Sequence, residues 1–343
     1  MSPELSGRPP RSLRVDWALA IGGLWVVVGI YCDLAWHVRH DVDSFLTWAH
    51  AALYAGLLYT FVATGIIAWR NVRDGYAWAR ALPAGYEYTP FGIGLFFIGG
   101  AADATGHILW GFESGFNALL SPTHQLIGFS IILLLIGPIR SALASFDTPA
   151  PAAGGDNAAG WPAMLSIGAL MALVRWGLDP FFHPYAQARF GPSVPKGFTP
   201  DTISLQAMHF ALQEHGLASV LFSTIVMAGF ALYVARAFGK QSGAMVVIFL
   251  IGNGMTSMAV GNDWTQMAAP IAASLLAGFV ADRIARPNVM AAVVPIVYNG
   301  LVAAVAVVGG TWWDPIFLLG TVIYSGLFGW LLSLIVTARR RSA

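Results

Sequence analysis

The chain has 343 residues, of which 57% are hydrophobic and only 10% are charged, and its formal net charge is +1. Soluble domains carry about 25% charged residues, so this composition excludes an ordinary soluble protein and indicates one that lies in a lipid bilayer. The near-neutral charge excludes a nucleic-acid-binding protein, which needs a basic face. The single cysteine excludes a disulfide framework and a cysteine-rich metal site.

Ten apolar segments are long enough to form membrane-spanning helices. A helix needs roughly 17–25 apolar residues to cross about 30 Å of hydrocarbon, and helices are required because backbone polar groups in lipid must be satisfied internally. The segments are 15–37, 48–69, 89–110, 122–143, 160–178, 211–236, 243–262, 265–283, 287–309 and 314–337. We therefore predict an all-α polytopic integral membrane protein with about ten transmembrane helices.

Basic residues gather at one end of these segments. If the N-terminus is cytoplasmic, most of the 18 Lys and Arg fall on the cytoplasmic side, as the positive-inside rule requires. All eight histidines then lie at or beyond the outer membrane face. We expect both termini to be cytoplasmic, the location to be a bacterial inner membrane, and the histidines to face the periplasm.

Two connections divide the chain. Residues 145–160 are rich in Pro, Ala and Gly and predict a flexible cytoplasmic linker. We expect this linker to separate the hairpins of residues 1–144 from the helices of residues 161–343. A long outer loop, 179–210, follows, with a short interfacial helix expected around 201–213; loops of this length are uncommon unless they are functional.

The first two hairpins repeat one arrangement of polar residues. The first copy reads Asp33-x-x-x-His37, then Asp43-Ser44, then Leu46-Thr47-x-x-His50. The second reads Asp103-x-x-x-His107, then Glu113-Ser114, then Leu120-Ser121-x-x-His124. So many matching positions indicate an internal duplication.

The spacing within each copy suits metal ligation. Residues four apart share one face of a helix, and a hydroxyl N-cap at Thr47 or Ser121 places the following histidine in the first turn of the return helix. We predict that the metal ligands are Asp33, His37, His50, Asp103, His107 and His124, with Asp43 and Glu113 orienting the imidazoles. Two imidazoles and a carboxylate fit copper, zinc or iron.

Other interpretations of these residues stay open. Asp33 could pair with Arg39, the six side chains could simply be solvated at the headgroup level, and His50 and His124 could be axial ligands of a haem. Against the first two, ionisable residues inside spanning segments are costly and usually functional.

A third hairpin carries a partial copy of the same pattern. Asp179 and His183 repeat the spacing of four, but Pro180 and Pro184 break a regular helix there. The weaker candidate ligands of this region are Asp179, His183, His209, Glu214 and His215.

The first repeat resembles the copper-site signature in the C subunit of the copper membrane monooxygenases, the family of the particulate methane and ammonia monooxygenases. Asp33, Trp36, His37 and His50 match that motif position for position, and the turn from Ser121 to His124 is similar to the Thr-Pro-Ser-His turn of the family. The resemblance implies copper held by Asp33, His37 and His50 in a helical oxidoreductase subunit facing the periplasm. The family's C subunit has fewer helices.

The region from Gly111 to His124 is also similar to polytopic membrane proteins of bacteria, particularly actinobacteria, which imply no activity. Three functions follow from these observations. The chain is a copper-binding membrane subunit, a metal-handling permease built from repeats, or an accessory subunit of a membrane complex. Its expected partners are the bilayer and either other membrane subunits or further copies of itself.

Overall fold

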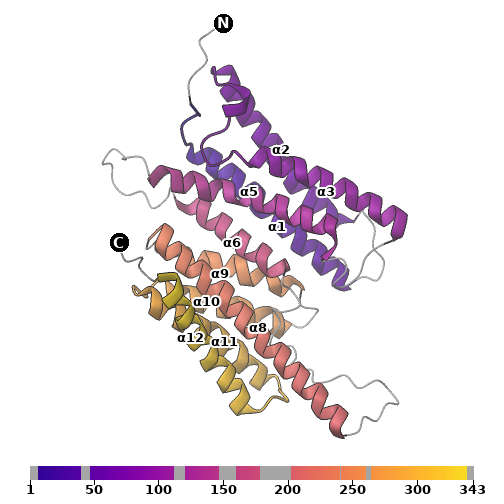
Figure 1. The fold of residues 1–343 in the computed structure, drawn as a ribbon, viewed down its shortest axis with the longest axis vertical. Coiled ribbons are helices and arrows are strands. Elements are labelled where there is room, and N and C mark those ends of the chain that lie inside the picture. Colours follow the sequence, from indigo (N-terminus) through magenta and orange to yellow (C-terminus); the bar gives the residue numbers. More distant parts are fainter. Residues whose placement is uncertain are drawn as a thin grey trace. The chain divides into compact units, whose positions relative to one another are not determined.

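The computed structural model describes residues 7–39, 47–111, 120–146, 160–177, 202–239, 241–259 and 264–337. Over these ranges the chain is helical and contains no strand (Figure 1). It divides into two compact units, Met1–Gly177 and Leu178–Ala343. The predicted all-α class is therefore confirmed.

The first unit contains two helical hairpins and one further helix. The hairpins are α1 (Leu13–Arg39) with α2 (Trp48–Arg73), and α3 (Thr89–Trp110) with α5 (Pro122–Phe146). A short 3₁₀ helix, η1 (Trp78–Arg80), lies between them, and α6 (Trp161–Gly177) follows.

The second unit is also made of helices connected in series. These are α8 (Thr202–Ala237), α9 (Ala244–Gly254) with the 3₁₀ helix η4 (Met255–Ala259), α10 (Trp264–Ala281), α11 (Pro287–Val308) and α12 (Pro315–Thr337). The interfacial helix expected around 201–213 is not separate, because α8 runs for 36 residues without a break. At 1.5 Å per residue it is about 54 Å long, which exceeds the thickness of the hydrocarbon.

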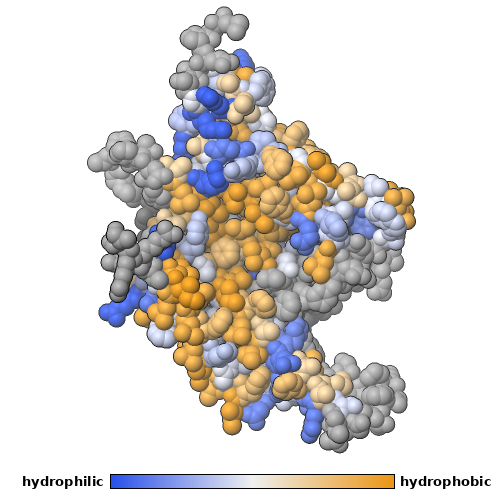
Figure 2. All heavy atoms as spheres, in the orientation of Figure 1, coloured by the Kyte–Doolittle hydropathy of each residue, from blue (hydrophilic) through white to orange (hydrophobic). Residues whose placement is uncertain are grey.

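Within the described ranges, each of the ten predicted segments coincides with one α-helix. Seven of them, α1, α2, α3, α5, α8, α11 and α12, are long and apolar enough to cross a membrane, while the apolar parts of α9 and α10 are shorter. Large apolar side chains such as Leu58, Phe61 and Ile323 are exposed on these helices, and Figure 2 shows hydrophobic residues over much of the visible face. Exposed apolar surface on this scale fits contact with lipid. The number of spans and the orientation stay predictions.

The duplication extends from the polar residues into the packing of the helices. A Cβ at Gly29 would overlap the backbone of Leu53, and one at Gly99, the equivalent position, would lie 2.9 Å from Ile127 Cγ1. Leu53 and Ile127 are themselves equivalent, three residues after His50 and His124. Glycine therefore lets the two helices of each hairpin approach closely just below the polar residues.

The two hairpins also pack against each other and against α6. Helix α1 contacts α5, α2 contacts α3, and α6 contacts both α1 and α5. The first helix of each repeat thus touches the second helix of the other, as expected for two similar hairpins related by a rotation. The compact units divide after Gly177, so α6 groups with the hairpins rather than with the helices that follow; the linker residues 147–159 lie outside the described ranges.

A buried carboxylate, that of Asp16, lies near the start of α1, at the opposite end of this helix from Asp33. Asp16, 1% exposed, accepts hydrogen bonds from Arg11 Nε at 2.7 Å, Tyr86 Oη at 2.7 Å and Ser141 Oγ at 2.8 Å. Burial and the neighbouring Asp16 carboxylate raise the pKa of the Tyr86 phenol, so it stays protonated and donates. This cluster ties the start of α1 to α5 and to the segment before α3.

Replacing Gly29 tests the close approach of α1 and α2. In Gly29→Ala the added methyl group meets Leu53 backbone that cannot move aside, and overpacking of this kind costs about 1–3 kcal/mol. Thermal unfolding of the purified protein should show a lower Tm. Gly65→Ala, in α2, is the control, because its methyl group meets no atom within 4 Å. Equal Tm values for both variants would contradict the close contact.

Candidate metal centres

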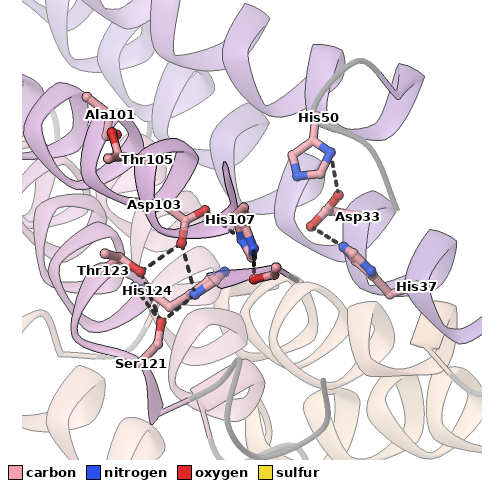
Figure 3. A network of polar contacts seen from close by, with 11 residues as sticks. Asp33, His37, His50, Ala101, Asp103, Thr105, His107, Ser121, Thr123 and His124 are labelled. Carbon is pink, nitrogen blue, oxygen red and sulfur yellow. Dashed lines mark hydrogen bonds and ion pairs between the residues drawn. The ribbon is translucent and has the colours of Figure 1, made fainter. Parts of the chain in front are cut away.

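The first group of ligand-type side chains forms where α1 ends and α2 begins. Asp33 Oδ2 lies 3.4 Å from His37 Nε2, one turn further along α1, and Asp33 Oδ1 lies 3.4 Å from His50 Nδ1, in the first turn of α2 (Figure 3). One donor atom from each residue can be chosen so that all three lie within 4.8 Å of one another. The convergence expected from the sequence is therefore present.

The second group has the same geometry between α3 and α5. Asp103 Oδ2 lies 3.4 Å from His107 Nε2, and Asp103 Oδ1 lies 3.4 Å from His124 Nδ1. These three residues also offer donor atoms within 4.8 Å of one another. The same carboxylate oxygens and ring nitrogens face each other in both copies, so the duplication reaches individual atoms (Figure 3).

A hydroxyl at the start of the return helix sets the position of the last histidine. Thr47 Oγ1 accepts the backbone N–H of His50 at 3.1 Å and lies 2.9 Å from its Nδ1. Ser121 Oγ accepts the N–H of His124 at 3.4 Å and lies 2.7 Å from its Nδ1. The predicted N-caps are thus confirmed, and each one also fixes an imidazole ring. An ion bound at that Nδ1 would replace the contact with the hydroxyl.

The distances within each group fit a shared metal ion. A metal about 2.1 Å from imidazole nitrogen and carboxylate oxygen holds neighbouring ligands about 3.4 Å apart in a tetrahedron and opposite ligands about 4.2 Å apart. Direct N–H···O hydrogen bonds are shorter, about 2.7–3.2 Å. The separations of 3.4 Å join the two histidines of each group to different oxygens of its aspartate, and they are compatible with three side chains that close around one ion. Small inward movements of the three side chains would bring their donor atoms within bonding distance of one ion.

Two further polar atoms support ligation. Asp33 Oδ1 is buried and makes no hydrogen bond within the described residues, although buried polar atoms are nearly always paired. In the second group, His107 Nδ1 lies 3.3 Å from the carbonyl of Gly111. With the proton on Nδ1 donated to that carbonyl, Nε2, which faces Asp103, carries the lone pair that metal ligation requires.

The remaining predicted site residues fall outside these groups. Four of them lie outside what the structure describes: Asp43, Glu113, Asp179 and His183. The side chain of Arg39 lies outside it as well. On α8, His209, Glu214 and His215 belong to neither group. The His209 ring instead packs on Trp312, with centroids 4.6 Å apart.

Sequence reasoning missed Thr123, whose hydroxyl donates to Asp103 Oδ1 at 2.7 Å. Thr123 directly precedes the predicted ligand His124, and this position could have indicated a hydroxyl close to the site. Gly111 was also missed as the partner of His107.

These features define a multi-pass helical membrane protein with two Asp/His/His groups that could each hold a metal ion. Comparison of the chain with protein-family models, curated proteins and solved structures finds no match. The argument for function therefore depends on the two groups themselves.

Replacing Gly111 tests the role of its carbonyl in orienting His107. Gly111 has φ +84°, which an alanine adopts only with strain. Gly111→Ala should displace the carbonyl and weaken metal binding at the second group about tenfold, measured by competition with a chelator. Gly310→Ala is the control, because Gly310 has φ +83° but lies in the second unit. If both variants bind metal alike, the carbonyl does not orient the ligand.

Proposed function

We propose that this chain is a metal-binding protein of a bacterial inner membrane, with one ion held in each repeat at the periplasmic ends of the hairpins. The observation that carries the proposal is the recurrence of one donor geometry. Asp33, His37 and His50 are placed as Asp103, His107 and His124 are, and the two aspartate–histidine separations in each group are all 3.4 Å. Both copies of the duplicated hairpin contain the same three ligand types in the same arrangement, which supports a shared role in binding an ion.

Membrane energetics also favour a bound ion. Asp103 is 9% exposed and lies within a predicted span, where an uncompensated charge costs several kcal/mol. Imidazoles compensate a carboxylate only when they are protonated. A divalent ion compensates it while the imidazoles stay neutral, and it uses the lone pairs that point into the group.

We further propose copper as the ion. Imidazole-rich sites suit copper, zinc and iron alike, so the donor set leaves a choice among metals. The copper-site signature matched by Asp33, Trp36, His37 and His50 supports copper and, with it, a place in an oxidoreductase related to the membrane monooxygenases. Copper bound there would supply one-electron chemistry, while the protein's own groups fix the imidazoles and the carboxylate.

Elemental analysis of the purified protein tests the proposal. The wild type should contain about two metal ions per chain, because each repeat supplies two imidazoles and a carboxylate. The variant His37→Ala with His107→Ala removes one ligand from each group and should contain almost none. His209→Ala with His215→Ala is the matched control and should keep both ions, since neither residue belongs to a group.

Equal metal content in the wild type and in the His37→Ala, His107→Ala variant would contradict the proposal. The same analysis identifies the metal, so zinc or iron in place of copper would contradict only the assignment of copper.

A further inference from the structure

We propose that the two metal sites are unequal: the second site retains its ion, the first site exchanges it, and Thr123 is the positioning residue that makes the difference. This inference rests on the proposed metal binding. The two repeats share their candidate ligands but differ at neighbouring positions, and the inference depends on those differences.

The carboxylates of the two sites are held differently. Asp103 Oδ1 accepts a hydrogen bond from the Thr123 hydroxyl at 2.7 Å. The equivalent of Thr123 in the first repeat is Ala49, one residue before His50, and alanine has no donor. In keeping with this, Asp33 Oδ1 is buried and accepts no hydrogen bond from the part of the chain that the structure describes. The Thr123 hydroxyl thus restrains this oxygen in the second site, whereas in the first site the corresponding oxygen has only the His50 ring nitrogen beside it, at 3.4 Å, among the described residues (Figure 3).

The exposure of the ligands differs in the same direction for two of the three pairs. The Asp33 and His37 side chains are 21% and 39% exposed, whereas those of Asp103 and His107 are 11% and 10% exposed. The third pair is reversed, with His50 at 13% and His124 at 25%. Since a carboxylate and an imidazole are both more enclosed in the second site, solvent and competing ligands reach that ion less easily.

A ring contact also restrains the first site. Tyr54 stacks on the His50 ring, with centroids 5.9 Å apart and an interplanar angle of 26°, and its equivalent in the second repeat is Gly128. This ring contact holds an imidazole that Thr47 already fixes. It adds no hydroxyl donor to the Asp33 carboxylate, so the difference between the carboxylates at the position of Thr123 remains.

Fixing a ligand before the ion arrives strengthens binding, because the ion no longer bears the cost of ordering that ligand. Hydrogen-bond partners of ligands change metal affinity by about 10–100-fold. We therefore expect the second site to bind a given ion about 10–100-fold more tightly than the first. The first site, which is more open and has Ala49 in place of the Thr123 hydroxyl, is then where ions enter and leave the protein.

The test uses the full-length protein in detergent, loaded with Cu²⁺ and challenged with increasing concentrations of a chelator. His37→Ala with His50→Ala leaves only the second site, and His107→Ala with His124→Ala leaves only the first. We expect half-removal of copper from the second site to need about 10–100-fold more chelator. Equal concentrations would overturn the inference and leave the proposed function intact. Failure of the wild type to retain Cu²⁺, Zn²⁺ or Fe²⁺ in the same assay would overturn both.

The role of Thr123 is tested within the protein that retains only the second site. Thr123→Ala reproduces the first repeat at this position and should bring copper retention down to that of the first site. Thr123→Ser keeps the donor and should restore retention, which separates the hydrogen bond from packing. Thr105→Ala is the control, because the exposed Thr105 hydroxyl donates to the Ala101 carbonyl on the same helix. Unchanged retention in Thr123→Ala would overturn the assignment of Thr123.

Discussion

The close contact between the two helices of each hairpin is what the rest of the site depends on. An aspartate on one helix and a histidine on the next can share an ion only if the helix axes lie near each other at that level. Gly29 against Leu53 and Gly99 against Ile127 provide this approach about one turn below the ligands. In lipid, where apolar burial gives little drive for association, small residues and interhelical polar contacts supply it. The close helix contact and the Asp/His/His group above it therefore depend on each other in each hairpin.

Most of the site could be predicted from the sequence, because it is set by local geometry. The spacing of four between Asp33 and His37 fixes a shared helix face, and a hydroxyl N-cap three residues before His50 fixes that ring in the first turn. Both rules act over a few residues and need no knowledge of the tertiary fold. The same pattern recurs seventy residues later, and this recurrence supports the prediction that both sets of residues form a site.

The parts that could not be predicted depend on contacts between distant segments or on the continuity of a helix. The hydrogen bond from Thr123 to Asp103 depends on how α5 is rotated about its axis relative to α3. The spacing of residues along α5 does not determine that rotation. The grouping of α6 with the hairpins depends on packing against α1 and α5, which the linker's composition does not encode. The unbroken run of α8 from Thr202 was missed because its first turns are polar enough to suggest a surface segment.

The two aspartates of α1 have different partners, and the difference supports the proposed ion at one end of this helix. Asp16 and Asp33 are separated by about 25 Å along a helix that rises 1.5 Å per residue. Arg11, Tyr86 and Ser141 donate to Asp16, and the arginine also balances its charge. Asp33 faces two imidazoles, and its Oδ1 receives no hydrogen bond from the described residues. The carboxylate of Asp16 is satisfied by donors from its own protein, whereas a cation held by the two imidazoles would balance the charge of Asp33.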